Sequence, residues 1–433
     1  MKRKNTAFRL AAVAVTGALV LAGCGSDGDS DETASPSPST ETSASSPAVE
    51  GDGTLTFGQL LPQTGSLAFL GPPEFAGVDL AIKDINAAGG VLGKDVVGVR
   101  GDSGDTDSGI APAETDALLD KGSDVIIGAA SSGVSLTVID KIMSAGAVMF
   151  SPANTSTAFD EGDYAEPDSY FRTAPSDILQ GAVMANLLIE DGRTNVAIMA
   201  RQDAYGETLA EQIGNNLEAA GSSVATTVFY GEKAQSFDSQ VAEVAGSGAD
   251  AIVLVAFEET TSIIPQLVQA GVGPQDLPTY FVDGNTASYA ADASTPLPDG
   301  ILEGTKGTIP GAETAADFKD RLLEVNPDLT DYSYSAESYD ATIVSALAAI
   351  EAGSDAGEAI AEHVVDVTTG GTKCTTFEEC AGLLEDGEDI DYDGVSGPIE
   401  LGETGSPTAA SIGIYEYDAK NNISPVDYIS GTI

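Results

Sequence analysis

The stretch TLTFGQLLPQTGSLAFLGPPEFAGVDLAIKDINAAGGVLGK, residues 54–94, predicts the fold of the chain. Residues 55–61 form a short apolar run with the length of a buried strand. Over residues 74–88 apolar side chains recur at helical spacing, and Gly89 and Gly90 then end the helix. Strands that alternate with helices of this length are typical of α/β folds with parallel sheets.

The same unit recurs along the chain. Before residue 175 we expect further strands at 96–99, 125–127 and 148–150, and helices at 111–121 and 134–145. The alternation then restarts, with helices expected at 179–190, 208–220, 237–244 and 263–270, and strands at 196–199, 224–229, 251–255 and 279–282. Two such runs predict an α/β protein with two similar Rossmann-like lobes.

Four loops follow expected strands, at residues 128–132, 151–155, 201–206 and 257–261. In parallel sheets, ligands bind beyond the carboxyl ends of the strands, where these loops lie. The loops are rich in hydroxyl side chains and lack a phosphate-binding lysine, a GxGxxG motif or a metal cluster, so we expect no cofactor. Hydroxyls and helix amino termini suit a small anion such as a carboxylate. Alternatively, each hydroxyl only caps a helix.

The amino terminus is typical of an export signal. Lys2, Arg3, Lys4 and Arg9 precede an apolar stretch, residues 10–21, that is shorter than a membrane-spanning helix. The stretch ends in LAGC, which resembles the bacterial lipobox, where lipid is attached to the cysteine before cleavage. We therefore expect cleavage before Cys24 and a diacylglycerol or palmitate anchor on Cys24 that holds the protein on the outer face of the cell membrane.

Residues 25–53 contain no Lys or Arg and a single branched aliphatic residue, Val49. Such a segment buries too little apolar surface to order itself, so we predict a disordered tether of about 30 residues. Cleavage removes four basic residues and no acidic one, so the formal charge changes from −50 to −54. A chain this acidic repels nucleic acid and anionic headgroups, and nucleic-acid binding is excluded.

The cysteines and the single histidine limit the possible chemistry. With Cys24 expected to carry lipid, Cys374 and Cys380 remain as a pair in an oxidising compartment, and their spacing predicts a small disulfide loop. One histidine, His363, cannot build a multi-histidine metal site, and no G-x-S-x-G elbow is present. We expect no enzymatic activity and no metal.

The body of the chain resembles the type I periplasmic binding proteins, in the branch of leucine/isoleucine/valine-binding proteins of ABC importers. The resemblance runs from about residue 54 to the carboxyl terminus. The motifs that carry it are LLPQTGSLA (60–68), AIKDINAAGGVLGK (81–94), VIIG (125–128), SPANT (151–155), FRTAPSD (171–177) and YG (205–206). The family implies two lobes that close on a ligand around a hinge of three crossovers.

The resemblance also implies the domain boundaries. The crossovers are expected near residues 172–176, 308–311 and 394–398. After a signal peptide at 1–23 and a lipidated linker at 24–53, lobe 1 would comprise 54–174 with 310–394. Lobe 2 would comprise 175–309 with 395–433, and a monomer is expected.

In amino-acid binders of this family, hydroxyls and a backbone group hold the ligand carboxylate, and the matching positions here are Ser132 or Ser131, Thr155 and Ala153. A tyrosine covers the ligand and an acid pairs with its ammonium, which implies Tyr205 and Asp283. Phe257 is also expected to contact the ligand, although it replaces a tyrosine of the family pattern. The sequence departs from the pattern again at Leu70, where an aromatic residue is common.

Three functions follow from these observations. The first is a solute-binding lipoprotein that delivers a branched-chain amino acid, or a related amide, urea or aromatic acid, to an ABC permease. The second is a ligand sensor that acts with a membrane signalling partner, and the third is a cell-surface hydrolase. Glu258 and Glu259 either reach the ligand or cap the following helix.

Overall fold

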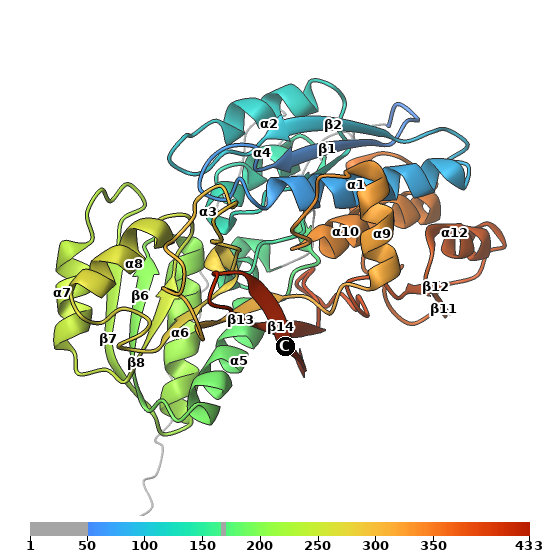
Figure 1. Cartoon of the computed structure of the whole chain (residues 1–433). Helices are drawn as coiled ribbons and strands as arrows, with labels where there is room; N and C mark the ends of the chain where they lie inside the picture. Colours follow the sequence, from blue (N-terminus) through green and yellow to red (C-terminus); the bar gives the residue numbers. More distant parts are fainter. Residues whose placement is uncertain (1–50, 166–169) are drawn as a thin grey trace, which may run out of the picture. The chain divides into compact units, whose positions relative to one another are not determined.

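The computed structural model describes residues 51–165 and 170–433 (Figure 1). The predicted export signal, Cys24 and all but the last residues of the predicted tether lie outside these ranges. Within these ranges, every helix is too short or too polar to cross a membrane. The lobe boundaries given above stay a prediction, and the two lobes are described below by the sheets on which they are built.

Lobe 1 is built on a parallel sheet of five strands in the order β2-β1-β3-β4-β5. The strands are β1 (Thr56–Leu61), β2 (Val97–Asp102), β3 (Val125–Gly128), β4 (Val148–Ser151) and β5 (Tyr170–Arg172). The chain adds β2 on one side of β1 and β3 on the other, so the order reverses between β1 and β3. In doubly wound sheets a ligand crevice forms at such a switch point, beyond the carboxyl ends of the two strands.

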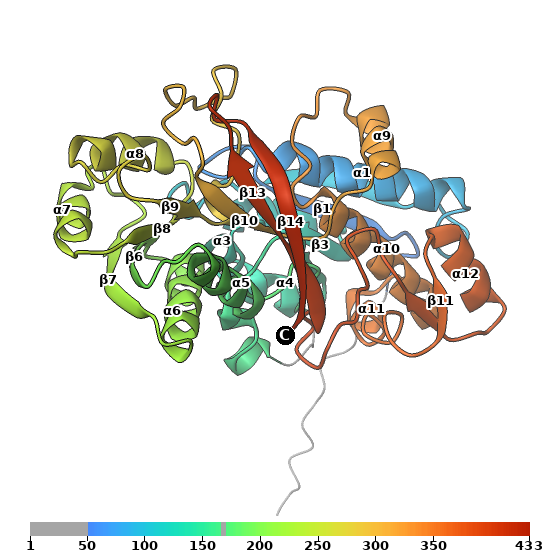
Figure 2. The same ribbon diagram turned by 60° about the horizontal axis from the view of Figure 1, so that its bottom comes forward.

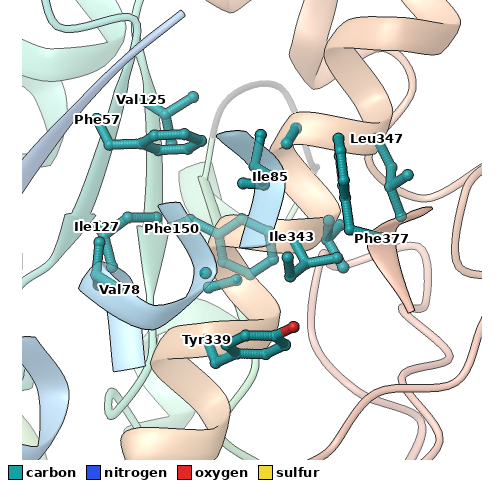
Figure 3. Close-up of a cluster of buried hydrophobic side chains, with 14 of the residues drawn as sticks. Phe57, Val78, Ile85, Val125, Ile127, Phe150, Tyr339, Ile343, Leu347 and Phe377 are labelled. Carbon is teal, nitrogen blue, oxygen red and sulfur yellow. The ribbon is translucent and has the colours of Figure 1, made fainter. Parts of the chain in front are cut away.

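Helices from both ends of the sequence belong to this lobe. They are α1 (Gly71–Ala87), α2 (Ala111–Leu119), α3 (Ser132–Ser135), α4 (Ile139–Ser144), α9 (Ala316–Val325), α10 (Ser335–Ala352), α11 (Gly357–Ala361) and α12 (Phe377–Glu385). In Figure 3 Phe57 and Phe150 from the sheet lie near Ile343 of α10, in one buried cluster. Because α10 is buried along nearly its whole length, it ties the late segment of the chain to the first sheet.

A small appendage completes lobe 1. Strands β11 (Thr372–Cys374) and β12 (Ile390–Tyr392) pair in parallel beside α12. Cys374 and Cys380 form the predicted disulfide, which joins the end of β11 to α12. Both cysteines are buried in the lobe 1 core.

Lobe 2 contains a seven-stranded sheet in the order β14-β13-β10-β9-β8-β6-β7. The strands are β6 (Asn195–Arg201), β7 (Ser223–Tyr230), β8 (Ala251–Val255), β9 (Thr279–Phe281), β10 (Lys306–Pro310), β13 (Ala409–Tyr417) and β14 (Ile423–Thr432). The helices are α5 (Asp177–Glu190), α6 (Ala204–Ala219), α7 (Asp238–Gly246) and α8 (Thr260–Gln269). Here the order reverses between β6 and β8, which places a second switch point beyond their carboxyl ends.

The predicted α/β class with two parallel-sheet lobes is confirmed, with two local differences. The expected helix at 134–145 is two short helices, α3 and α4, because the β-branched residues Thr137 and Val138 interrupt it. The Thr137 hydroxyl donates to the Val134 carbonyl, which favours a turn there. The second sheet also ends in an antiparallel hairpin, β13 and β14, that the strand and helix rhythm did not predict (Figure 2).

Candidate functional site

The two switch points share one small cavity. Its wall from lobe 1 consists of residues after β1, β3 and β4 and of Tyr334 before α10, and its wall from lobe 2 of residues after β6, β8 and β9. The lining residues are Leu67, Leu70, Ala130, Ser131, Ser132, Ala153, Tyr205, Phe257, Asp283, Gly284 and Tyr334. Six of the seven predicted ligand residues are among them, and Thr155 is not. The cavity has a volume of about 10 Å³, which is close to the space of one water molecule.

Asp283 is the charged group of this cavity. It lies just beyond β9, at the start of a single 3-10 turn, Asp283–Asn285, and its residue is 7 % exposed. Its Oδ1 accepts hydrogen bonds from the Tyr205 hydroxyl at 2.6 Å and from Gln180 Nε2 at 2.9 Å. Its Oδ2 accepts from the Tyr334 hydroxyl at 2.8 Å. Three neutral donors therefore surround one buried carboxylate.

No lysine, arginine or histidine in the described ranges forms an ion pair with Asp283. Burial raises the pKa of Asp283, and the three hydrogen bonds limit that rise. A second buried acid, Asp177, lies nearby, and Gln180 Nε2 is also 3.5 Å from its Oδ1. Burial first, and then the charge of Asp283, raise the pKa of Asp177 to about 8. At neutral pH Asp177 is therefore largely protonated, and its carboxyl group adds little negative charge beside Asp283.

Aromatic rings and one arginine support the lobe 2 wall. The rings of Tyr205 and Phe257 stack with centroids 5.4 Å apart. On Phe257, Arg201 Cζ lies 3.6 Å from the ring centroid, which is a close cation–π contact. Arg201 Nε also donates to Asp203 at 2.6 Å, and Asp203 caps α6 by accepting from the Gly206 amide. The start of α6, with Tyr205, is therefore fixed by Arg201.

Glu258 and Glu259 were predicted either to contact the ligand or to cap the following helix, and their positions in the structure correct this prediction. Glu259 precedes α8, but its side chain does not cap the helix. Its carboxylate accepts from Arg201 Nη1 at 2.8 Å and from the Tyr230 hydroxyl at 2.9 Å. Glu258 is exposed, and neither acid lines the cavity. Together with Asp203, Glu259 balances the buried guanidinium of Arg201. Glu259 lies 58 residues from Arg201 along the chain, so this pair cannot be identified from neighbouring residues in the sequence.

The lobe 1 wall carries hydroxyls and no charge. Ser131 is the N-cap of α3, and its Oγ accepts from the Val134 amide at 3.5 Å. Ser132 Oγ accepts from the Ser156 amide at 3.4 Å. The cap interpretation therefore applies to Ser131, while the Ser132 hydroxyl keeps its proton available for a further acceptor.

Behind this wall, Arg172 holds the loop that contains Ala153 and Thr155. The guanidinium is fully buried and donates to the carbonyls of Asn154 and Ser156, at 3.2 and 2.9 Å. Thr155 is buried, and its hydroxyl makes no hydrogen bond of ordinary geometry, although it is close enough to Asp177 to lower the pKa of that acid. The loop is therefore held by Arg172, a residue that does not line the cavity.

Sequence reasoning missed two residues that contact Asp283. Tyr334 lies directly before α10 with φ of 57°, a left-handed conformation that is uncommon for a residue other than glycine. Gln180 lies on α5, and its Oε1 accepts from the Thr308 hydroxyl at 3.0 Å. Neither residue belongs to a strand-end loop, so the signal that identified the other site residues did not include them.

Two α/β lobes that share one cavity at both switch points form an architecture in which a small molecule can bind between the lobes. The chain belongs to the periplasmic binding protein family, whose model matches residues 54–422. Members of this family are solute-binding proteins, and membership implies an exported protein that binds a small molecule.

The chain is similar to several known proteins. It is 26 % identical over 358 residues to the chemotactic signal transduction system substrate-binding protein BasB of Halobacterium salinarum, covering 80 % of this chain and 83 % of that one. It is 29 % identical over 286 residues to Leu/Ile/Val-binding protein homolog 2 of Brucella abortus, covering 63 % and 73 %. The crystal structure of the leucine-binding protein LivK of Thermotoga maritima has the same fold, with a TM-score of 0.68, 21 % identity, and coverage of 87 % and 99 %.

Proposed function

We propose that this chain is a lipid-anchored solute-binding protein of an ABC importer, and that it holds a small zwitterion of the amino-acid class between its lobes. The observation that carries this proposal is Asp283, a buried carboxylate with three neutral donors and no cationic partner among the described residues. Burying a carboxylate without a counter-charge is unfavourable, and a ligand ammonium group would supply that charge.

The opposite wall suits the other end of a zwitterion. Ser132, whose hydroxyl lines the cavity beside Ala153, offers a donor that can bind a carboxylate. Leu67, Leu70 and the rings of Tyr205 and Phe257 supply apolar surface for an aliphatic side chain. These contacts support a branched-chain amino acid more than urea, which has no apolar part.

Ligand entry requires the cavity to widen, because about 10 Å³ cannot contain an amino acid. The hydrogen bond from Tyr334 of lobe 1 to Asp283 of lobe 2 is the contact that an ammonium group would replace or share. Rotation of the lobes about the segments that connect them would open this bond, as hinge motions do in proteins of two lobes.

Calorimetry with three matched compounds tests the zwitterion. Leucine carries both charges, leucinamide lacks the carboxylate, and 4-methylpentanoate lacks the ammonium group. We expect leucine to bind and each analogue to bind at least roughly tenfold more weakly, since each lacks one charge-assisted contact. Equal or tighter binding of 4-methylpentanoate or of benzoate would exclude the role of Asp283 and favour an aromatic or aliphatic acid. No binding by any of these compounds, or by other amino acids, amides and urea, would refute the proposal.

The anchor is tested separately. We expect the wild-type protein to partition with membranes and its Cys24→Ser variant to be released in soluble form or to keep its signal peptide. Mass spectrometry of the amino-terminal peptide identifies the lipid. An unmodified Cys24 in membrane-free wild-type protein would refute the anchor and leave the ligand proposal intact.

Ligand sensing is the second candidate, and the similarity to BasB favours it. Both candidates require ligand binding. In the first, uptake of the ligand depends on it, and in the second, ligand-directed movement of the cell. Loss of labelled ligand uptake in a deletion strain supports transport, whereas normal uptake with loss of ligand-directed movement supports sensing.

A further inference from the structure

Lobe 2 contains a second pocket at the amino-terminal ends of β9 and β10, the opposite ends of these strands from Asp283. Its volume is about 290 Å³, far larger than that of the cavity between the lobes. Asp191, Arg193, Pro278, Tyr280, Thr305 and Lys306 line it, with further residues at its rim. A pocket of this size approaches the range in which proteins bind small organic molecules.

One charge in the pocket is already balanced. Lys306 Nζ donates to both carboxylate oxygens of Asp191, at 2.7 and 2.8 Å. The Tyr280 hydroxyl donates to Asp191 Oδ2 at 2.8 Å. Asp191 is thereby neutralised and has little capacity to attract a further cation.

Arg193 differs from the other arginines. Of the five arginines between residues 51 and 433 that the structure describes, Arg100, Arg172, Arg201 and Arg321 each form an ion pair with an acid. Arg193 forms none within the same ranges. Acidic residues outnumber basic ones by 68 to 18 in this chain, so an arginine without an acidic partner is unexpected.

Two donors in this pocket also lack hydrogen bonds. Arg193 Nε is buried without a partner, and so is the hydroxyl of Thr305, a residue that is only 4 % exposed. The guanidinium of Arg193 lies beside the Tyr280 hydroxyl, which leaves most of its N–H groups available. Buried polar groups in folded proteins are normally satisfied by a partner, which here can be supplied from the pocket.

We propose that this pocket binds a small organic anion through Arg193 and Thr305, at a site separate from the cavity between the lobes. A carboxylate or phosphate group accepts hydrogen bonds from a guanidinium in a paired geometry and from a hydroxyl. Pro278 and the ring of Tyr280 provide apolar surface for the rest of the molecule. The acid at the rim, Glu303, is exposed to water, where its repulsion is weakened by salt.

A titration followed by NMR of backbone amides tests this site and locates it. The probes are benzoate and phenyl phosphate, with benzamide as the uncharged control. We expect both anions to shift the amides of residues 191–193 and 304–306 in a saturable manner, and benzamide to leave them unchanged. Amides near Ser132 and Asp283 report binding in the cavity between the lobes. The same spectra therefore show separately whether each of the two sites binds a probe.

Three variants determine whether Arg193 is responsible. Arg193→Gln should weaken binding of the anions roughly tenfold or more, as expected for loss of a charge-assisted hydrogen bond. Thr305→Val, which keeps the shape, should weaken it less. Lys420→Gln removes one positive charge from an exposed position elsewhere in lobe 2 and should have no effect. The proposal is overturned if neither anion shifts these amides, if benzamide shifts them equally, or if Arg193→Gln binds as the wild type does.

Discussion

The two walls of the cavity between the lobes are built in different ways. On the lobe 1 wall, Ser131 and Ser132 bond to amides of their own or a neighbouring loop, and the wall is neutral. On the lobe 2 wall, Asp283 is held by side chains that lie 51 to 103 residues away along the chain. The positions of the side chains in the neutral wall therefore depend on local sequence, whereas those in the charged wall depend on the complete fold.

The largest expected effect concerns Asp177, whose amide donates to the Thr155 carbonyl of lobe 1 and whose carboxylate faces Asp283. Its pKa is raised to about 8, above the value in an unfolded chain. The stability from such a group is present below the unfolded pKa and is lost as pH rises through the folded pKa. Asp177→Asn should therefore be more stable than the wild type at pH 9, by up to roughly 5 kcal/mol, and the gain should vanish near pH 4.

Urea unfolding of both proteins from pH 4 to pH 9 measures this difference, and the value at pH 4 is the internal reference. A constant difference across the whole range would mean that Asp177 ionises in the folded protein as it does in the unfolded one. Asp177 would then be ionised at neutral pH, and a second negative charge would lie beside Asp283.

The next largest effect concerns Arg201, which supports the lobe 2 wall from behind. Arg201→Gln leaves Asp203 and Glu259 without their cation and removes the contact on Phe257. We expect a loss of about 3–5 kcal/mol in the free energy of unfolding, the usual result of breaking a buried ion pair. Arg100→Gln is the matched control, because its pair with Asp79 is exposed and should contribute at most about 1 kcal/mol.

Equal losses in the free energy of unfolding of these two variants, measured by urea unfolding, would show that the buried ion pairs of Arg201 stabilise the protein no more than an exposed ion pair does. A loss of ligand affinity in Arg201→Gln, at a urea concentration where the variant is still folded, would show in addition that Arg201 positions Tyr205.

The comparison between the walls is tested most directly at Asp283. Asp283→Asn keeps the shape and removes the charge, so we expect leucine binding to weaken by at least about 1.5 kcal/mol. Glu258→Gln is the control, since it removes one negative charge from an exposed position of the same lobe. Unchanged affinity in Asp283→Asn, measured by calorimetry, would remove Asp283 from the site. Because burial raises the pKa of Asp283, wild-type affinity should also fall as the solution becomes acidic enough to protonate it.

The sequence predicts much of the fold because the signals for it are local. Gly89 and Gly90 follow α1, and a glycine ends most of the other helices in both lobes. The hairpin of β13 and β14 was not predicted, because β14 is largely exposed and has no apolar periodicity. The contacts that fix its pairing with β13 cannot be predicted from any local sequence pattern.

The site was predicted less completely for the same physical reason. Strand-end loops indicated the position of the cavity, and the family resemblance supplied Tyr205 and Asp283. Tyr334 and Gln180 lie outside such loops and reach Asp283 only after the lobes have formed. Thr155 has the expected place after β4, but Thr155 does not line the cavity. A side chain's direction depends on packing, which sequence spacing does not report.

The smallest expected effects separate the two serines of the neutral wall. Ser131→Ala removes the N-cap of α3 and should reduce the free energy of unfolding by about 1 kcal/mol, with little change in leucine affinity. Ser132→Ala removes a hydroxyl that can donate to the ligand carboxylate and should weaken leucine binding by about 1 kcal/mol, since only one hydrogen bond is lost. Calorimetry and urea unfolding on both variants give four values. If Ser131→Ala has the larger effect on binding, the cap is also the carboxylate donor, and the neutral wall has the two serines in exchanged roles.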